Sequence, residues 1–563
     1  MTEDRRNFIL FAVIAFVILI GWQLVVDRLI PPATPPKSVI VEGQSKPVSN
    51  PAADPTADSP AATRSRDQVL TASRAERIRI DTPALAGSIN LRGAKIDDLV
   101  LKRHKESLKT DSPPIRLLSP AGAPEAYFAQ LGWRGLPADT VWRANSNLLA
   151  PGRPVTLEAA NATGQRFRIE LAVDSDYLFT IKQTVANAGA AAVAVAPYGL
   201  VNRSGISKDP DYWTMHAGPM WVGNGAAHYA PDFSEVDEAP QSFRTTGGWL
   251  GFTDMYWLTA LVPDQGQAFD GQFRAGPNKT YQADFALSER VLPPGKALTT
   301  TSRLFAGAKE VATLDRYTEA GVPKLDYAID WGWFQVVEKP IFYYLDWLFR
   351  LVGNFGGAII LLTITIRLLM LPIAQKQFAS MAAMKVVQPK MKVIQDRYKD
   401  DKEKMQREVM ALYKAEGVNP LAGCLPVILQ IPIFYALYKV LMLTIEMRHQ
   451  PFIGWVKDLS APDPLTPINL FGLLPFDPPS FLHLGVLAIL LGVTMWLQFK
   501  LSPPAGDPAT QQVMMFMPWL MMFIFAPLAA GLQLYYVMSN IISIGQQKLL
   551  YMRHPALKDA PAT

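Results

Sequence analysis

The stretch PATQQVMMFMPWLMMFIFAPLAAGLQLYYVMSNIISIGQQ, residues 508–547, decides the fold, because its forty consecutive residues carry no charge. A helix of roughly 20 apolar residues crosses the hydrocarbon core of a bilayer, so this stretch has room for two short spans. Pro527 and Gly531 interrupt it within the segment APLAAG, residues 526–531. Because proline and glycine end helices, we expect a tight helical hairpin with its turn at this segment.

Four further stretches bring the expected number of transmembrane helices to six. They are residues 8–26, residues 355–374 with Arg367 as their single charge, residues 421–438 and residues 482–499. The first stretch is longer than the apolar part of a cleaved signal peptide, so residues 1–30 are expected to be an uncleaved N-terminal anchor. The sequence thus predicts an α-helical polytopic membrane protein.

Basic residues give the expected orientation of these spans. Residues 375–418 contain ten Lys and Arg, whereas residues 445–481 contain only Arg448 and Lys457. Since short cytoplasmic loops carry the excess of positive charge, we expect the basic loop and both termini in the cytoplasm. Residues 27–340 then lie on the outer side of the membrane.

A large water-soluble part accounts for the rest of the 563 residues. Residues 31–74 are rich in Pro, Ala, Ser and Thr, a composition typical of a flexible linker. From residue 75 apolar and polar residues alternate, as in Phe167, Ile169 and Leu171. This period of two predicts a large antiparallel β-sandwich domain over residues 75–325.

The remaining segments complete the expected domain organisation. Residues 326–353 are aromatic and mildly amphipathic, which predicts a helix lying flat in the outer interface. Residues 354–555 are expected to form a five-helix core with a cytoplasmic helical hairpin at 376–418. Pro389 is expected near the start of the hairpin's first helix. Residues 556–563 form a short tail.

Enzyme signatures are absent from the sequence. It has no Walker loop and no HExxH, CxxC or G-x-S-x-G motif. Its one cysteine, Cys424, cannot form an internal disulfide or a multi-cysteine metal site. A net charge of +5 is too dilute to indicate nucleic-acid binding, so no direct specific nucleic-acid readout is expected. We therefore expect no enzyme, no catalytic residue, no metal and no cofactor.

The informative polar residues lie inside the predicted spans. An Arg at the centre of a span costs about 2.5–3.5 kcal/mol on insertion scales, so Arg367 has to reach water or a partner. It could extend toward the cytoplasmic interface or face a buried aqueous site that Thr363, one turn away, would share. The sequence favours the second reading over the first.

A polar stripe along the last span supports that reading. Its members recur at intervals of 3, 4, 3 and 4 residues: Gln533, Tyr536, Asn540, Ser543 and Gln547. Such a stripe serves either hydrogen bonds between helices or the lining of a cavity. Together with Arg367, Thr363 and Gln430 it favours a hydrated groove, and because the spans hold no acidic residue, the groove suits a transient anionic ligand.

Several short motifs recur in and between the predicted spans of the second half of the chain. They are NPLAGCLP at 419–426, QIPIF at 430–434, ALY at 436–438, MALYKAE at 410–416, FMP at 516–518, GLQLYY at 531–536, and Ser539-Asn540, together with Thr363 and Arg367. This set resembles the motifs of the YidC family of bacterial membrane protein insertases. The resemblance covers roughly residues 340–555 motif by motif, and the six-span layout with a large outer domain is similar to the Gram-negative branch of the family.

The resemblance implies insertion and folding of nascent membrane proteins at the bacterial inner membrane, alone or with the Sec translocon, with a periplasmic outer domain. It implies a substrate groove that holds Arg367, Thr363, Gln430, Tyr536, Gln533 and Asn540. An apolar substrate helix would slide past Phe434, Met517 and Met521. The cytoplasmic hairpin would dock the ribosome or the signal-recognition-particle receptor through Lys385, Lys390, Lys392 and Arg397.

Two alternative functions stay open at this point. A secondary transporter or anion channel could use Arg367 as an anion site, although the chain shows none of the paired repeats typical of transporters. An envelope-assembly scaffold could use its outer domain alone, but this alternative leaves the polar stripe unexplained.

Overall fold

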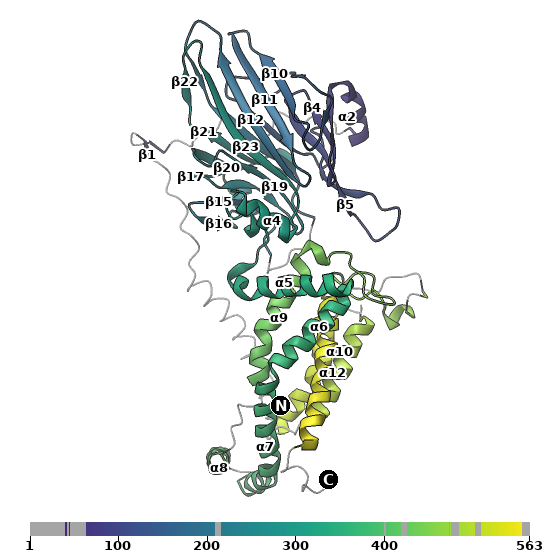
Figure 1. Ribbon diagram of the computed structural model, residues 1–563. Coiled ribbons are helices and arrows are strands. Elements are labelled where there is room, and N and C mark those ends of the chain that lie inside the picture. Colours follow the sequence, from purple (N-terminus) through teal and green to yellow (C-terminus); the bar gives the residue numbers. More distant parts are fainter. Residues whose placement is uncertain are drawn as a thin grey trace. The chain divides into compact units, whose positions relative to one another are not determined.

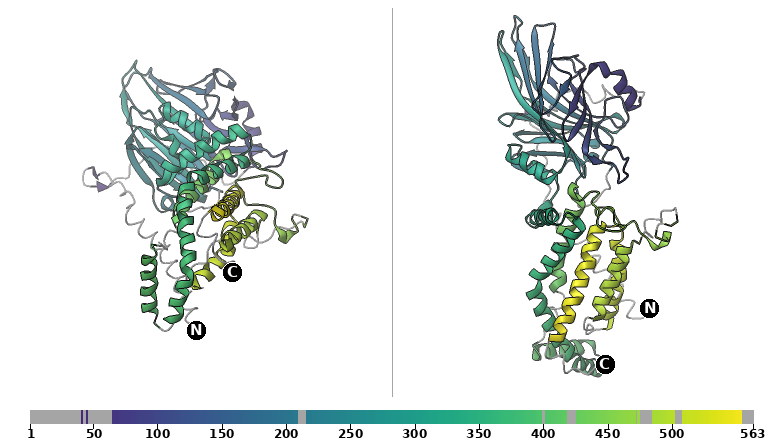
Figure 2. Two further views of the ribbon diagram at one scale, coloured as in Figure 1. Left: turned by 60° about the horizontal axis from the view of Figure 1, so that its bottom comes forward. Right: turned by 45° about the vertical axis from the view of Figure 1, so that its right-hand side comes forward.

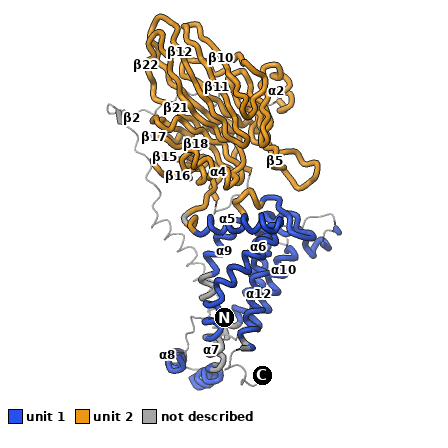
Figure 3. Tube along the Cα trace, in the orientation of Figure 1, with its two compact units in different colours: residues 1–45, 337–441, 448–563 blue, residues 46–336, 442–447 orange. Residues whose placement is uncertain are grey.

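The computed structural model describes residues 40–41, 44–45, 64–208, 215–398, 401–417, 425–471, 473–474, 484–501 and 508–553. The predicted span at residues 8–26 and the tail at 556–563 lie outside this part of the chain, and of the predicted linker at 31–74 it includes 40–41, 44–45 and 64–74. Within that linker, Arg66–Ala72 form a helix. The chain divides into two compact units (Figure 3). One is built of residues 46–336 and 442–447, and the other of residues 1–45, 337–441 and 448–563.

Two large sheets form the first unit (Figure 1). In spatial order, the nine-stranded sheet contains β16 (Ala226–His228), β15 (Gly218–Gly223), β18 (Trp249–Thr253), β19 (Trp257–Val262), β23 (Ala297–Ala308), β12 (Leu178–Asn187), β11 (Gln165–Val173), β10 (Val155–Ala160) and β8 (Arg143–Ala144). The ten-stranded sheet contains β17 (Gln241–Thr246), β20 (Ala268–Gly276), β21 (Thr280–Leu287), β14 (Pro197–Ser204), β7 (Tyr127–Trp133), β5 (Lys95–Lys105), β4 (Leu85–Asn90), β3 (Arg77–Asp81) and β9 (Leu148–Leu149), with β6 (Pro114–Leu118) beside β5.

Smaller elements accompany the sheets. They are the two-stranded pair β13 (Val193–Val195) with β22 (Arg290–Leu292) and the helices α2 (Arg66–Ala72), α3 (Phe233–Glu238) and α4 (Val311–Glu319). The pair β1 (Ile40–Val41) with β2 (Gln44–Ser45) belongs to the other unit.

The predicted antiparallel β domain is confirmed by these pairings. Along β11, Phe167, Ile169 and Leu171 are buried, whereas Arg166 and Arg168 between them are exposed, as a period of two requires. The strand pairs of both sheets are antiparallel except β3 with β9, which run parallel. Large buried aromatic side chains, Trp133, Trp249, Phe179 and Phe285 among them, fill the core of this unit.

A charged cluster fixes the start of α4. The Glu310 carboxylate accepts hydrogen bonds from Tyr177 Oη at 2.6 Å and Thr313 Oγ1 at 3.0 Å, and it lies 3.2 Å from His104 Nε2. Burial alone would raise the pKa of Glu310, but the hydrogen bonds with His104, Tyr177 and Thr313 outweigh it and hold this pKa below its usual value. The cluster therefore stabilises the folded β domain with Glu310 ionised.

Residues 442–447, which follow the helix α9 (Leu425–Leu443) in the chain, belong to the β-domain unit. Tyr256 Oη donates to the Met442 carbonyl at 3.1 Å, and the first backbone N–H of α4 donates to Glu446 Oε1 at 2.8 Å. A carboxylate at a helix N-terminus is favourable because the helix dipole is positive there. The segment is thus tied to the β domain by polar contacts as well as by the buried side chains of Ile445 and Met447.

Helices make up the second unit (Figures 1 and 2). After α5 (Gln335–Val352) come α6 (Phe355–Leu369), α7 (Leu371–Arg397), α8 (Lys402–Ala415), α9, α10 (Val486–Leu501), α11 (Pro508–Phe525) and α12 (Ala530–Arg553). The last helix, α12, packs against both α6 and α10, and α11 packs against α10. α11 ends at Phe525, directly before the segment 526–531 where the sequence predicts a turn, and α12 begins within that segment at Ala530.

The apolar helices of this unit are short. Within the described residues, no single helix has both the length and the apolar character to cross a membrane, but Phe355–Leu369 and Leu371–Ala379 do so as a pair bent by 55°. Three shorter apolar helices cover Gln430–Leu443, Val486–Leu501 and Gln512–Phe525. The six-span topology stays a prediction.

The bend refines one expectation about residues 355–418 and corrects another. The span predicted over 355–374 is built of two helices that are bent at Met370, because Pro372 lacks an N–H and clashes with the preceding turn. We also expected Pro389 near the start of a hairpin helix. Since α7 starts at Leu371, directly after the bend, Pro389 lies well inside it.

Helix α5 has apolar residues on two faces. Phe342, Leu345 and Leu348 are buried in the protein, whereas Tyr343, Trp347 and Leu351, four residues apart, form an exposed stripe. A stripe of this kind is typical of a helix that rests on the membrane interface.

The proline-rich loop before α10 is held by one buried carboxylate. Asp463 accepts hydrogen bonds from Trp455 Nε1 at 3.0 Å, from the Leu465 N–H at 3.0 Å and from the Leu487 N–H at 2.8 Å. Leu487 lies in the first turn of α10, whose N–H groups have no partner within the helix. The loop thereby caps α10.

Candidate functional site

Arg367 reaches from α6 to α12. Its Nε donates to Ser539 Oγ at 2.9 Å, and its Nη2 contacts the same oxygen. The side chain is half-buried, and in the part of the chain that the structure describes no carboxylate forms an ion pair with it. A cation in low-dielectric surroundings with only a hydroxyl as partner attracts anions more strongly than one in water.

Two tyrosines on α12 lie beside this contact and connect to α9. Gln430 Nε2 of α9 donates to Tyr535 Oη at 2.8 Å. Tyr536 packs edge-on against Phe434 of α9, with ring centroids 5.7 Å apart, and against Phe525 of α11 at 4.7 Å. The predicted residues Gln430, Phe434 and Tyr536 thus meet where α9, α11 and α12 converge, and all three are half-buried.

The rest of the polar stripe on α12 makes contacts within or between helices. Asn540 Nδ2 donates to Thr494 Oγ1 of α10 at 3.1 Å. Ser543 Oγ donates to the Ser539 carbonyl of its own helix at 2.8 Å. The stripe was expected either to form hydrogen bonds between helices or to line a cavity. Asn540 forms a hydrogen bond between helices.

Two predicted groove residues direct their polar atoms into the backbone. Thr363 Oγ1 donates to the Ile359 carbonyl at 2.6 Å and is fully buried. Gln533 Nε2 donates to the carbonyls of Phe525 at 3.0 Å and Leu528 at 2.8 Å, so it caps the end of α11 and closes the α11–α12 hairpin. In both contacts a backbone carbonyl takes up the side-chain donor, of the same helix for Thr363 and of the end of α11 and the following turn for Gln533.

The predicted sliding surface lies on α11 near the aromatic cluster. Met517 and Met521 are half-buried and four residues apart, so they share one face of the helix. Met522, also on α11, packs closely against Gly492 of α10, where an added Cβ would come within 3.2 Å of the Met522 Cβ. Flexible methionine side chains suit a surface that accepts apolar partners of different shape.

The hairpin of α7 and α8 carries the predicted docking residues. Lys390 forms an ion pair with Glu416 at 2.6 Å, and Tyr413 Oη lies 3.1 Å from Met391 Sδ, so the two helices run antiparallel. Lys392 and Arg397 are exposed, whereas the side chain of Lys385 lies outside the described part. No group of three or more metal-binding side chains occurs among the described residues.

Spacing and charge alone single out none of Ser539, Tyr535 and Thr494. Ser539 and Tyr535 enter the expectations as members of the motifs Ser539-Asn540 and GLQLYY, and Thr494 is one of the few polar residues of its span. Their contacts depend on which helices pack together, so the motifs did not show what these side chains bind.

Comparisons with known proteins cover almost the whole chain. Residues 347–557 match the family described as "60Kd inner membrane protein", and residues 77–344 match the "YidC periplasmic domain". The chain is 49% identical over 562 residues to the "Membrane protein insertase YidC" of Zymomonas mobilis subsp. mobilis, covering 98% of this chain and 96% of that relative. The protein of the same description from Methylorubrum extorquens is 43% identical over 596 residues, with the same coverage.

Proposed function

The chain belongs to the YidC family of membrane protein insertases, and we propose that its insertase activity proceeds through a hydrophilic groove beside Arg367. It is an inner-membrane insertase with a large periplasmic β domain. The observation that supports the groove is the half-buried Arg367 guanidinium, held by the Ser539 hydroxyl with no carboxylate in ion-pair contact within the described residues. Neither of the two relatives compared above is a transporter or a channel.

The groove lowers the cost of moving polar groups across the bilayer. An unpaired polar group costs several kcal/mol in hydrocarbon, roughly 2–7 kcal/mol per amide or hydroxyl. A short acidic segment of a nascent chain would leave the cytoplasm, pair with Arg367 and find polar neighbours at Tyr536 and Gln430. A membrane potential that is negative inside favours the outward movement of each negative charge by about 2.3 kcal/mol per 100 mV. No nucleotide is required.

The apolar helix of the substrate would follow along the faces of α9 and α11. Phe434, Met517 and Met521 are half-buried, so they have surface left for an incoming side chain. Since lipid tails and these side chains are equally apolar, the helix passes sideways into lipid with little change in free energy. We assign no catalytic residue to this process.

Orientation and partners complete the proposal. The basic hairpin and both termini face the cytoplasm in a six-span arrangement, as expected from the charge of the loops. Exposed Lys392 and Arg397 suit the anionic surface of a ribosome, and the signal-recognition-particle receptor is a second candidate for the same face. The Sec translocon would receive or deliver substrates that the protein does not insert alone.

Purified protein in liposomes tests the activity. We expect insertion of a single-span substrate with a short acidic outer tail, without ATP and without other proteins. A matched protein with Arg367→Ala should insert the same substrate more slowly, and Lys392→Ala is the control that retains the wild-type rate when no ribosome is present. Equal rates for wild type and Arg367→Ala would contradict the groove, whereas transport of a small anion would contradict the insertase assignment.

A further inference from the structure

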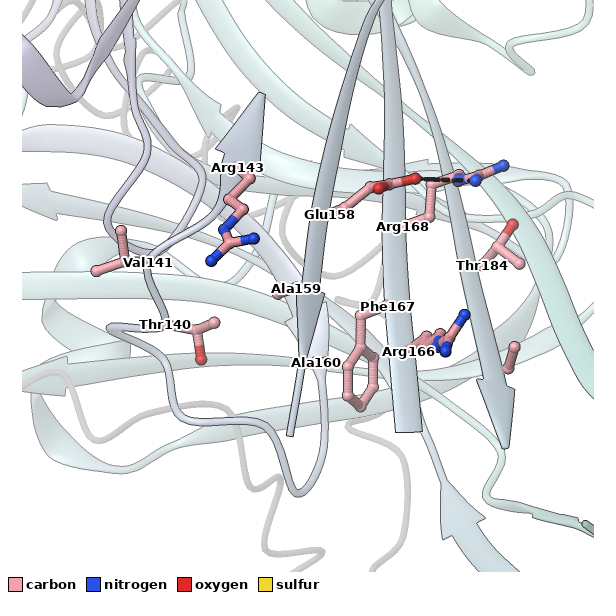
Figure 4. A pocket seen from close by; sticks show the side chains of 11 residues that line it. Thr140, Val141, Arg143, Glu158, Ala159, Ala160, Arg166, Phe167, Arg168 and Thr184 are labelled. Carbon is pink, nitrogen blue, oxygen red and sulfur yellow. Dashed lines mark hydrogen bonds and ion pairs between the residues drawn. The ribbon is translucent and has the colours of Figure 1, made fainter. Parts of the chain in front are cut away.

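A pocket of about 800 Å³ opens on the solvent face of the nine-stranded sheet of the β domain. It lies over β8, β10, β11 and β12, and Figure 4 shows its charged side chains. We call it the arginine pocket, after Arg143, Arg166 and Arg168, which line it together with the single acid Glu158. Its volume lies within the range of about 300–1,000 Å³ that is usual for ligand sites.

Only one of the three guanidinium groups has its charge balanced. Arg168 donates from Nε and Nη2 to Glu158 Oε1, at 3.0 and 2.8 Å. Among the residues that the structure describes, the guanidinium groups of Arg143 and Arg166 make no hydrogen bond and no ion pair. The three arginines and one glutamate therefore leave two positive charges in the pocket.

The register of the strands shows where a carboxylate is missing. Arg168 on β11 stands opposite Glu158 on β10, and this pair forms the ion pair. Arg166 occupies the equivalent place two residues earlier on β11, but its neighbour on β10 is Ala160. On its other side Arg166 faces Ala186 of β12. Small side chains thus keep space open beside Arg166 where an incoming carboxylate would fit.

The edge of the sheet is also open at this place. β8 is the last strand of the sheet in the described part of the chain, and it pairs with β10 only at Leu157 and Glu158. The end of β10, Ala159 and Ala160, extends past β8. An exposed strand edge of this kind is a template for an extended peptide.

We propose that the arginine pocket binds an extended acidic peptide segment, whose carboxylates pair with Arg166 and Arg143 and whose backbone follows the end of β10. A peptide fits better than a compact anion because the two unpaired arginines lie on opposite sides of β10 (Figure 4). A concave pocket beside an open strand edge also fits a chain better than a flat anionic membrane. This site is separate from Arg367 and does not depend on the proposed groove.

Fluorescence anisotropy of a labelled Glu-Thr-Glu-Thr-Glu-Thr peptide tests the proposal. The full-length protein is held in nanodiscs of zwitterionic lipid, and the Gln-Thr-Gln-Thr-Gln-Thr peptide serves as the control ligand. Arg166→Ala and Arg143→Ala should each weaken binding by about fivefold, the size expected of an exposed ion pair. Ala160→Glu should weaken it by about tenfold, because the new carboxylate would pair with Arg166 internally as Glu158 pairs with Arg168.

The matched variant Ala160→Gln separates charge from bulk. It adds the same volume without charge, so it should retain binding within about twofold. Wild-type affinity in Ala160→Glu and in the double variant Arg143→Ala, Arg166→Ala would overturn the proposal. Equal competition by inorganic phosphate, or Arg166-dependent binding to nanodiscs that contain phosphatidylglycerol, would assign the pocket to a phosphate group and also overturn it. Insertion activity of these variants stays at the wild-type level, so failure here is distinct from failure of the groove.

Discussion

Replacing Arg367 removes a half-buried positive charge between α6 and α12 that could attract an acidic substrate. Two unit charges 4 Å apart interact by about 4 kcal/mol at an effective dielectric constant of about 20, and by about 1 kcal/mol in water. Because Arg367 is half-buried, its attraction for a carboxylate lies between these limits and toward the lower one. A loss of about 1.4 kcal/mol, which corresponds to a factor of ten, is the expected size for Arg367→Ala.

The three substitutions Arg367→Lys, →Ala and →Glu should form a series. Lys keeps the charge but loses the two-nitrogen contact to Ser539, so its rate falls least. Ala removes the charge, and Glu repels an acidic segment, so Glu falls most. The assay follows protease protection of a single-span substrate in proteoliposomes, with an acidic outer tail or with the same tail carrying Gln in place of each acid.

The neutral-tail substrate is the control for folding. A variant that is correctly folded should insert it at close to the wild-type rate, because its neutral tail has no carboxylate for Arg367 to attract. If Arg367→Ala and Arg367→Glu both inserted the acidic-tail substrate as fast as wild type, the reasoning would be refuted. An equal slowing of both substrates would show that Arg367 acts on the packing of α6 against α12 instead.

Three more predictions concern the scaffold. Glu310→Gln should cost about 1–3 kcal/mol at neutral pH. The folded-state pKa of Glu310 lies below its ordinary value of 4.5. Its stabilisation is therefore complete above that ordinary value and is lost as pH falls through the lowered folded-state pKa. Thermal unfolding should show a shallower acid loss in the variant, and an unchanged slope would contradict this. Asp463→Ala should speed hydrogen exchange at the backbone amides of Leu465 and Leu487, which donate to the Asp463 carboxylate. Unchanged exchange at both amides would contradict its capping role. A fluorophore on Trp347→Cys, in a Cys424→Ser background, should be quenched by nitroxide lipids, and one on the exposed β-domain residue Val291→Cys should not.

Much of the β domain could be predicted from alternation alone. The runs at 167–171 and 179–181 are strands, because a strand that buries one face leaves a period of two in the sequence. The partners of each strand could not be predicted, since pairing depends on residues far apart in the chain. The small pairs at strand ends, such as β8 with β10, therefore appeared only in the structure, and with them the arginine pocket.

Within the helices, spacing predicted a polar face on α12 but not what each member does there. The spacing placed Gln533 and Asn540 on one stripe, and the structure shows that the first caps α11 whereas the second bonds to α10. The bend at Met370 was missed because mean hydropathy does not register the backbone constraint of Pro372. Arg367 was found because a lone charge in an apolar run is conspicuous in any sequence. Ser539 entered only as part of a motif, and its contact with Arg367 could not be predicted because a serine in a helix is ordinary.

Site-specific crosslinking of an arrested nascent chain tests the central claim most directly. A photoreactive residue is placed at Tyr536, Phe434 or Met517, and, as a control, at Leu490, an exposed residue of α10. The account predicts that the acidic segment of the substrate crosslinks at Tyr536 in an Arg367-dependent way, and that its apolar helix crosslinks at Phe434 and Met517 but not at Leu490. Crosslinks that are equally strong at Leu490, or that are unchanged at Tyr536 in Arg367→Ala, would contradict it.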